Sequence, residues 1–108
     1  MPLTNIITAT VTAYCACKIC CGPNAKGVTA NGQKPTPSHT IAAARTIPFG
    51  STVIIGTNTF KVEDRLAKRY DSRFDIFMAT HKEAKNYGIK TNQTVTIITH
   101  ETKQKTVK

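Results

Sequence analysis

The stretch "EDRLAKRYDSRFDIFM", residues 63 to 78, holds most of the acidic side chains of a strongly basic chain. The protein has six acidic residues against fifteen Lys and Arg, and four of the six lie here: Glu63, Asp64, Asp71 and Asp75. The run at 73 to 78 alternates between two faces, as a β-strand does. We expect the buried face to consist of Phe74, Ile76 and Met78. The opposite face then carries Arg73, Asp75 and Phe77. The stretch therefore predicts a strand that carries a carboxylate off the core.

Other segments also have the pattern of strands, and they indicate a mainly β domain. Alternating or β-branched runs lie at 6–14, 51–55, 59–64 and 93–99. The sequence "GTN" at 56–58 predicts a hairpin turn. Thr80 can cap a short helix, Glu83 occupies the capping-box position, and Gly88 ends the helix. Five or six short strands with one helix predict a small barrel.

Length and charge limit the possible architectures and partners. With 108 residues the chain is expected to be one domain, 1–108, with a core at about 6–99 and a basic polar tail at 100–108. No apolar run is long enough for membrane insertion, so none is expected. We also expect the protein to be a monomer. A net charge of +9 predicts attraction to nucleic acid, anionic lipid or wall polymers, or simply a soluble surface. Aromatics interleaved with Arg are missing, so no specific nucleic acid is expected.

Two carboxylates lie where predicted strands end. Asp64 closes the strand pattern at 59–64, and Asp75 points away from the core face of its own strand. A pair of this kind lets one carboxyl stay protonated near neutral pH, as a general acid requires. Arg65 and Arg73 act in the opposite direction, because they favour ionised carboxylates. The alternative is an ion-pair network in which Asp64 is a turn residue and Asp75 an Arg partner.

The same stretch resembles the pattern "EDTGGAIKGNRIDVYF" of the three-aspartate ("3D") domain, without a gap. That family is related to the catalytic part of membrane-bound lytic transglycosylase A and, more distantly, to rare lipoprotein A and expansins. Further matches follow the family order: "TATVTAYCACKICCG" at 8–22, "TANG" at 29–32, "TIAAARTIPFG" at 40–50 and "HKEAKNYG" at 81–88. The resemblance covers about residues 8 to 98 and rests on several motifs in the right order.

The resemblance implies a small six-stranded double-psi β-barrel that binds peptidoglycan glycan strands. It implies that Asp75 is the catalytic acid and base of a lytic transglycosylase and that Asp64 supports it. Such an enzyme forms 1,6-anhydro-N-acetylmuramic acid, so the sugar supplies the nucleophile and no cofactor is required. Substrate-binding residues are expected at Tyr14, Thr29, Arg65 and Arg73. From the sequence alone, Tyr14 can equally be a core residue of the barrel.

Two departures from the family pattern leave other functions open. Ala44 stands near the place of the family's first aspartate, and Arg65, Leu66 and Ala67 replace the "TGG" after "ED". Without those glycines the backbone is less accessible to a sugar. A second hypothesis is therefore a non-catalytic, expansin-like barrel that binds cell-wall glycan. A third, which depends only on charge and cysteines, is a small zinc-bearing protein that binds nucleic acid.

Four cysteines lie within seven residues, "CACKICC": Cys15, Cys17, Cys20 and Cys21. The spacing at 17 and 20 is that of a zinc-binding pair, which makes a structural zinc site one candidate. Disulfides and simple packing in a loop are the alternatives. We expect at least one metal-binding or disulfide pair among the four.

The N-terminal segment "MPLTNIITATVTAY" has no basic n-region, apolar h-region or cleavage site. It predicts synthesis in the cytoplasm without a signal peptide. Action at a bacterial cell wall then needs another route, such as a bacteriophage lysis system of the endolysin type, a virion, or fusion to other subunits. The sequence leaves these three routes open.

Overall fold

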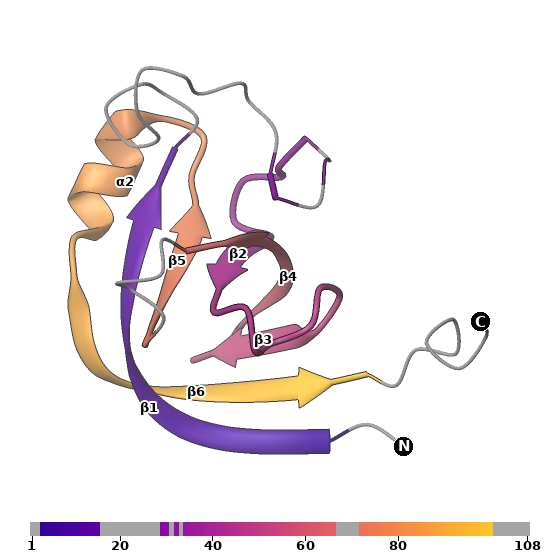
Figure 1. Ribbon diagram of the computed structural model, residues 1–108. Coiled ribbons are helices and arrows are strands. Elements are labelled where there is room, and N and C mark those ends of the chain that lie inside the picture. Colours follow the sequence, from indigo (N-terminus) through magenta and orange to yellow (C-terminus); the bar gives the residue numbers. More distant parts are fainter. Residues whose placement is uncertain (1–2, 16–28, 31, 33, 67–71, 101–108) are drawn as a thin grey trace.

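The computed structural model describes residues 3–15, 29–30, 32, 34–66 and 72–100. In this part of the chain six strands close into a barrel with one short helix beside it (Figure 1). The strands and the helix are β1 (Leu3–Tyr14), β2 (Thr40–Ala43), β3 (Thr52–Ile55), β4 (Asn58–Arg65), β5 (Arg73–Phe77), β6 (Lys90–Thr99) and α2 (His81–Tyr87). The predicted mainly β, six-stranded barrel with one short helix is confirmed.

The barrel is mixed, because its strands pair in both directions. The order around it is β1-β5-β2-β4-β3-β6, and β6 returns to β1. The β1/β5 and β2/β4 pairs are parallel, and the other four pairs are antiparallel. Residues 3–9 of β1 pair with β6, and residues 10–14 pair with β5; Val11 also pairs with Lys90 of β6 (Figure 1). A register shift between Ala9 and Val11 marks this change of partner.

Aliphatic and aromatic side chains from all six strands fill the barrel. The core cluster consists of Ala9, Val11, Ile41, Ala43, Val53, Ile55, Phe60, Val62, Phe74, Ile76, Val95 and Ile97. Full burial of one such side chain stabilises the fold by roughly 1.5–3 kcal/mol. On β5 the prediction is confirmed for Phe74 and Ile76. Met78, one residue past the strand, packs against the core cluster but is only half-buried, whereas Phe77, expected on the opposite face, is buried.

Two strands start earlier than the sequence pattern predicts. β1 begins at Leu3 rather than at residue 6, and β6 begins at Lys90 rather than at residue 93. In β1 the residues 3–8 are all exposed, so this part of the strand has no buried face to produce an apolar alternation. Pairing with β6, which the sequence pattern does not reveal, extends the strand there.

Helix α2 begins and ends as predicted. The Thr80 hydroxyl accepts a hydrogen bond from the Glu83 amide, and Glu83 accepts one from the Thr80 amide, which completes the capping box. Gly88 follows the helix with φ 70°, a conformation that favours glycine. No helix in the described part of the chain has the length and apolar character needed to span a lipid bilayer.

The connection between β2 and β3, residues 44–51, is hydrogen-bonded to β4. The Gly50 amide donates to the Val62 carbonyl at 2.8 Å, and the Val62 amide donates to the Ser51 carbonyl at 2.9 Å. Gly50 has φ 87°, where a side chain would be strained. These bonds hold the connection, including Phe49, close to the end of β4.

Candidate functional site

Three adjacent strands bring Asp64 and Asp75 to the same face of the barrel. In the strand register, Ala42 of β2 pairs with Asp75 on one side and with Asp64 on the other. Residues that pair directly across strands point to the same side. The two aspartates are therefore separated by two strand spacings, about 10 Å between Cα atoms. We call this side of β1, β5, β2 and β4 the carboxylate face; it carries Thr12, Tyr14, Asp75, Ala42 and Asp64.

A β-bulge at Glu63 places Asp64 on the carboxylate face. Ile41 pairs with Val62, but the next residue, Ala42, pairs with Asp64, so Glu63 is the extra residue. Strict alternation from Val62 would instead turn Asp64 toward the core. The Thr40 hydroxyl anchors the bulge by donating to Glu63 Oε1 at 2.6 Å.

The carboxylate of Asp64 accepts three hydrogen bonds. The Tyr14 hydroxyl donates to Oδ2 at 2.6 Å, and the amides of Ala30 and Arg65 donate to Oδ1 at 2.8 and 2.9 Å. Asp64 thereby joins the end of β1, its own strand and the segment at 29–30. Thr29 is buried in that segment, directly before Ala30. Asp64 is thus held rigidly by its neighbours.

The carboxyl of Asp75 is half-buried and has fewer donors. Among the described residues, its hydrogen bond comes from the Thr12 hydroxyl, which donates to Oδ1 at 2.9 Å. Burial raises the pKa of Asp75 to about 6; the Thr12 hydrogen bond lowers it, the charge of Asp64 raises it, and Arg73 lowers it. Asp75 can therefore exchange a proton near neutral pH.

Tyr14 lies at the end of β1, where it contacts both Asp64 and an aromatic neighbour. Its ring meets the ring of Phe77 edge to face, with centroids 5.4 Å apart and planes at 68°. This contact explains why Phe77 is buried although strand alternation places it on the side away from the core. Tyr14 itself is half-buried, so its ring is neither in the core cluster nor fully exposed.

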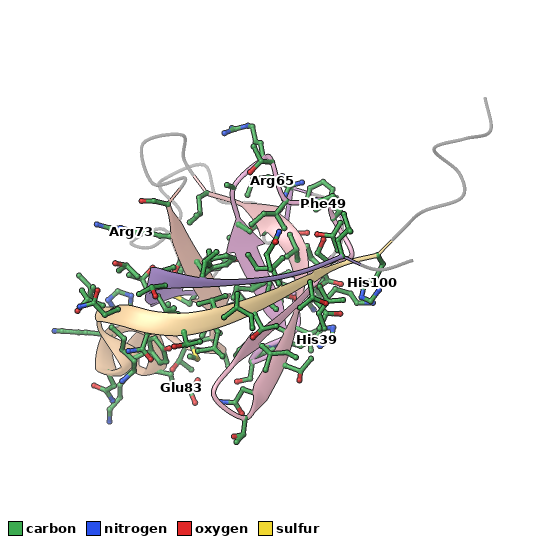
Figure 2. The ribbon with its side chains drawn as sticks, turned by 90° about the horizontal axis from the view of Figure 1, so that it is seen from below. His39, Phe49, Arg65, Arg73, Glu83 and His100 are labelled. Carbon is green, nitrogen blue, oxygen red and sulfur yellow. The ribbon has the colours of Figure 1, made fainter. Side chains whose placement is uncertain are left out.

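The two predicted arginines lie in different places. Arg73 pairs with Thr10 and lies two residues before Asp75, so both belong to the same side of β5. Arg65 pairs with Ala43, and alternation turns it to the side of β4 opposite to Asp64. Its guanidinium stacks over the Phe49 ring, 3.9 Å from the ring centroid (Figure 2).

Two contributors to this region, Thr12 and Phe49, were missed from the sequence, and Glu63 was recognised only as a member of the acidic cluster. A signal existed for Thr12, because it precedes Tyr14 by two residues in an alternating strand. No pattern revealed Glu63 as a bulge residue. Phe49 lies in a Pro–Phe–Gly turn, where an aromatic side chain has no core to enter.

The cysteine predictions cannot be judged from the described residues. Cys15 is buried at the end of β1, whereas Cys17, Cys20 and Cys21 lie outside the described residues. Within the described ranges, no group of three His, Cys, Asp or Glu side chains is placed to hold a metal ion. A zinc site or a disulfide at the cysteine cluster stays a prediction.

The carboxylate face can thus supply one carboxyl that titrates near neutral pH beside a second that is fixed by hydrogen bonds. This arrangement separates a proton-transferring group from a charge that tunes it. Comparison with models of known protein families and with curated proteins gave no match, so the resemblance to the three-aspartate domain is carried by its motifs alone.

Proposed function

We propose that the protein is a peptidoglycan lytic transglycosylase in which Asp75 is the catalytic acid and base. The observation that carries this proposal is the half-buried Asp75 carboxyl, whose pKa is raised to about 6. A general acid is most effective when its pKa lies near the working pH. The resemblance to the three-aspartate domain assigns this role to the same residue.

The proposed reaction needs one carboxyl and no water. Protonated Asp75 donates its proton to the oxygen that links N-acetylmuramic acid to N-acetylglucosamine, and the bond from that oxygen to C1 breaks. The resulting carboxylate takes the proton of the 6-hydroxyl of the muramic sugar as this oxygen bonds to C1. Asp75 is then protonated again, and the products are a free 4-hydroxyl and a 1,6-anhydro sugar. No cofactor takes part.

Asp64 supports the reaction electrostatically. Its negative charge raises the pKa of Asp75, while Arg73 lowers it. The hydrogen bonds from Tyr14, Ala30 and Arg65 occupy both oxygens of Asp64. Asp64 is therefore poorly placed to attack a sugar, and its role in this proposal is to keep Asp75 protonated at higher pH.

The finer fold assignment, a double-psi barrel of the three-aspartate family, is part of the proposal. A closed six-stranded barrel with two parallel strand pairs, β1/β5 and β2/β4, supports it. The proposed partner is the glycan strand of peptidoglycan, bound by a monomer at the bacterial cell wall. A phage lysis system or a virion is a proposed route to that wall.

Digestion of purified sacculi tests the catalytic role. We expect wild type to release 1,6-anhydro-muropeptides, detected by mass spectrometry. Asp75→Asn keeps the size and the Thr12 hydrogen bond but cannot transfer a proton, so the rate should fall by roughly 100-fold or more. The matched control is Glu83→Gln, the same chemical change on α2, which a capping box tolerates.

Other outcomes would replace the proposal. Products with a free reducing end would indicate water as the nucleophile. Wild type that binds sacculi and releases no anhydro product would favour a non-catalytic, expansin-like glycan-binding barrel. Ala44 favours that second function, because this buried alanine stands near the place where the family pattern has an aspartate.

A further inference from the structure

Two arginines, Arg45 and Arg65, lie at the end of the barrel where β2 and β4 run in parallel. Ala43, the last residue of β2, pairs with Arg65, the last residue of β4. Arg45 follows β2 by two residues, and the connection that begins there brings Phe49 under the Arg65 guanidinium (Figure 2). We call Arg45, Phe49 and Arg65 the arginine corner.

The guanidinium of Arg65 is held by an aromatic ring, but one of its nitrogen atoms has no hydrogen-bond acceptor. Its Cζ lies 3.9 Å from the centroid of the Phe49 ring, which fixes the plane of the group. Its Nη1 atom is buried and has no hydrogen-bond partner. Most buried polar atoms in folded proteins have such a partner, and an orphaned cationic donor is unfavourable. The planar fork of an arginine matches the paired oxygens of a carboxylate or phosphate.

The charges around Arg65 leave the corner positive. Burial and the positive charge of Arg45 lower the pKa of Arg65, while the negative charge of Asp64 raises it. The oxygens of Asp64 are occupied by Tyr14 and by two backbone amides. Among the described residues, the two arginines therefore act on each other as like charges, and neither forms an ion pair with a carboxylate.

We propose that the arginine corner is a binding site for an oxyanion, either a carboxylate or a phosphate, held between the guanidinium groups of Arg45 and Arg65. Arg45 is exposed and Phe49 is 40% exposed, so the corner is open to solvent. In this proposal the Arg65 side chain rotates on binding, so that the buried Nη1 atom reaches an anion that Arg45 also contacts. The anion removes the repulsion between the two cations and supplies the missing acceptor.

The natural source of this anion rests on the proposed function. A bacterial wall offers both chemistries: carboxylates on the peptides attached to the glycan, and phosphodiesters in teichoic polymers. Binding of the anion itself requires no glycan cleavage. It can therefore be measured with small molecules, and its failure can be told apart from failure of the catalytic proposal.

The test is a titration of the ¹⁵N-labelled full chain followed by NMR, at low ionic strength because salt screens such contacts. The probes are N-acetylalanine, glycerol 3-phosphate and, as an uncharged control, N-acetylalanine amide. We expect saturable shifts at the Nε–Hε signal of Arg65 and the amide signals of residues 45 and 49, with one anion or both but not with the amide. The anion that binds more tightly identifies the source.

Variants decide whether the corner is responsible. Arg65→Gln and Arg45→Gln should each weaken anion binding by roughly tenfold or more. Lys61→Gln removes the same charge from an exposed position on β4 and should change it by less than about twofold. If Arg65→Gln does not fold, the exposed Arg45 still provides the test. Absence of saturable shifts at Arg65, or equal weakening by Lys61→Gln, overturns the proposal. Unchanged anion binding by Asp75→Asn separates this site from catalysis.

Discussion

Strands β4 and β5 each deliver one aspartate to the carboxylate face, but in different ways. On β5 regular alternation places Asp75 opposite to its buried neighbours Phe74 and Ile76. On β4 a bulge at Glu63 is needed to turn Asp64 to the same side. The surroundings differ as well, because Asp64 accepts three hydrogen bonds and Asp75 accepts one from a described residue.

This difference separates a carboxylate that is held by hydrogen bonds from one whose pKa burial raises to about 6. Removal from water disfavours an ionised carboxyl unless hydrogen-bond donors replace the water. The donors around Asp64 do so, and they also join β1, β4 and the segment at 29–30. Among the described residues only the Thr12 hydroxyl donates to Asp75, and burial raises the pKa of this carboxyl to about 6. Asp64 should therefore stabilise the fold, whereas ionised Asp75 should destabilise it.

Removal of Asp64 is expected to have the largest effect on stability. Asp64→Ala leaves the Tyr14 hydroxyl and the amides of Ala30 and Arg65 without their acceptor. Hydrogen bonds to a charged group contribute about 1.5–3 kcal/mol each when buried, and these are partly exposed, so we expect a loss of about 3 kcal/mol. Urea unfolding at neutral pH, followed by circular dichroism, measures this loss.

The control for this variant is Glu83→Ala, which removes a carboxylate from the capping box of α2. Loss of such a cap lowers stability by about 1 kcal/mol. Equal losses for the two variants would contradict the structural role given to Asp64, because three hydrogen bonds would then contribute no more than one helix cap.

The face on which Asp75 lies could be predicted from the sequence of β5. The face on which Asp64 lies could not be predicted from the sequence of β4. Alternation assigns the faces of Phe74, Asp75 and Ile76 because the strand is regular and one side is buried. A bulge inserts one residue and reverses the alternation after it, and no residue type marks Glu63 as that residue. The resemblance placed Asp64 near Asp75 without explaining how the strand allows it.

Contacts between distant segments were also beyond the sequence pattern. The Ala30 amide reaches Asp64 from thirty-four positions away, and the Tyr14 hydroxyl reaches it from fifty. Such contacts depend on how β1 and β4 sit around the closed barrel. Composition and periodicity describe single strands and contain no information on the distance between their ends.

Ionisation of Asp75 is expected to destabilise the folded protein, and this effect depends on pH. Its pKa is about 6 in the folded protein against 3.8 ordinarily, so between these values the folded state holds a proton that the unfolded state has lost. The contribution of this group is fully present below about pH 4 and is lost as pH rises through about 6. Because the carboxyl is partly exposed, we expect the free energy of unfolding to fall by only about 2 kcal/mol over this pH range.

Asp75→Asn cannot lose this proton and keeps an oxygen for the Thr12 hydroxyl to donate to. Relative to wild type, the variant should therefore gain about 2 kcal/mol of stability as pH rises from about 4 to about 7. Urea unfolding of both proteins across this range measures the difference, and the titration of all other groups cancels in it. Parallel stability curves for the two proteins would show that Asp75 has no raised pKa in the folded state.

The smallest effect on stability is expected at Tyr14, whose hydroxyl contacts Asp64 of β4 and whose ring contacts Phe77 of β5. Tyr14→Phe keeps the edge-to-face contact with Phe77 but removes the 2.6 Å hydrogen bond to Asp64. Because the backbone amides of Ala30 and Arg65 still donate to the other carboxylate oxygen, Oδ1, we expect a loss of only about 1 kcal/mol in urea unfolding. Tyr87→Phe makes the same chemical change on α2, where the structure records no hydrogen bond from that hydroxyl to a described residue, and it should cost less than about 0.5 kcal/mol. If the two variants lose equal stability, the bond from Tyr14 does not hold Asp64, and the contrast between the two aspartates then depends on backbone donors alone.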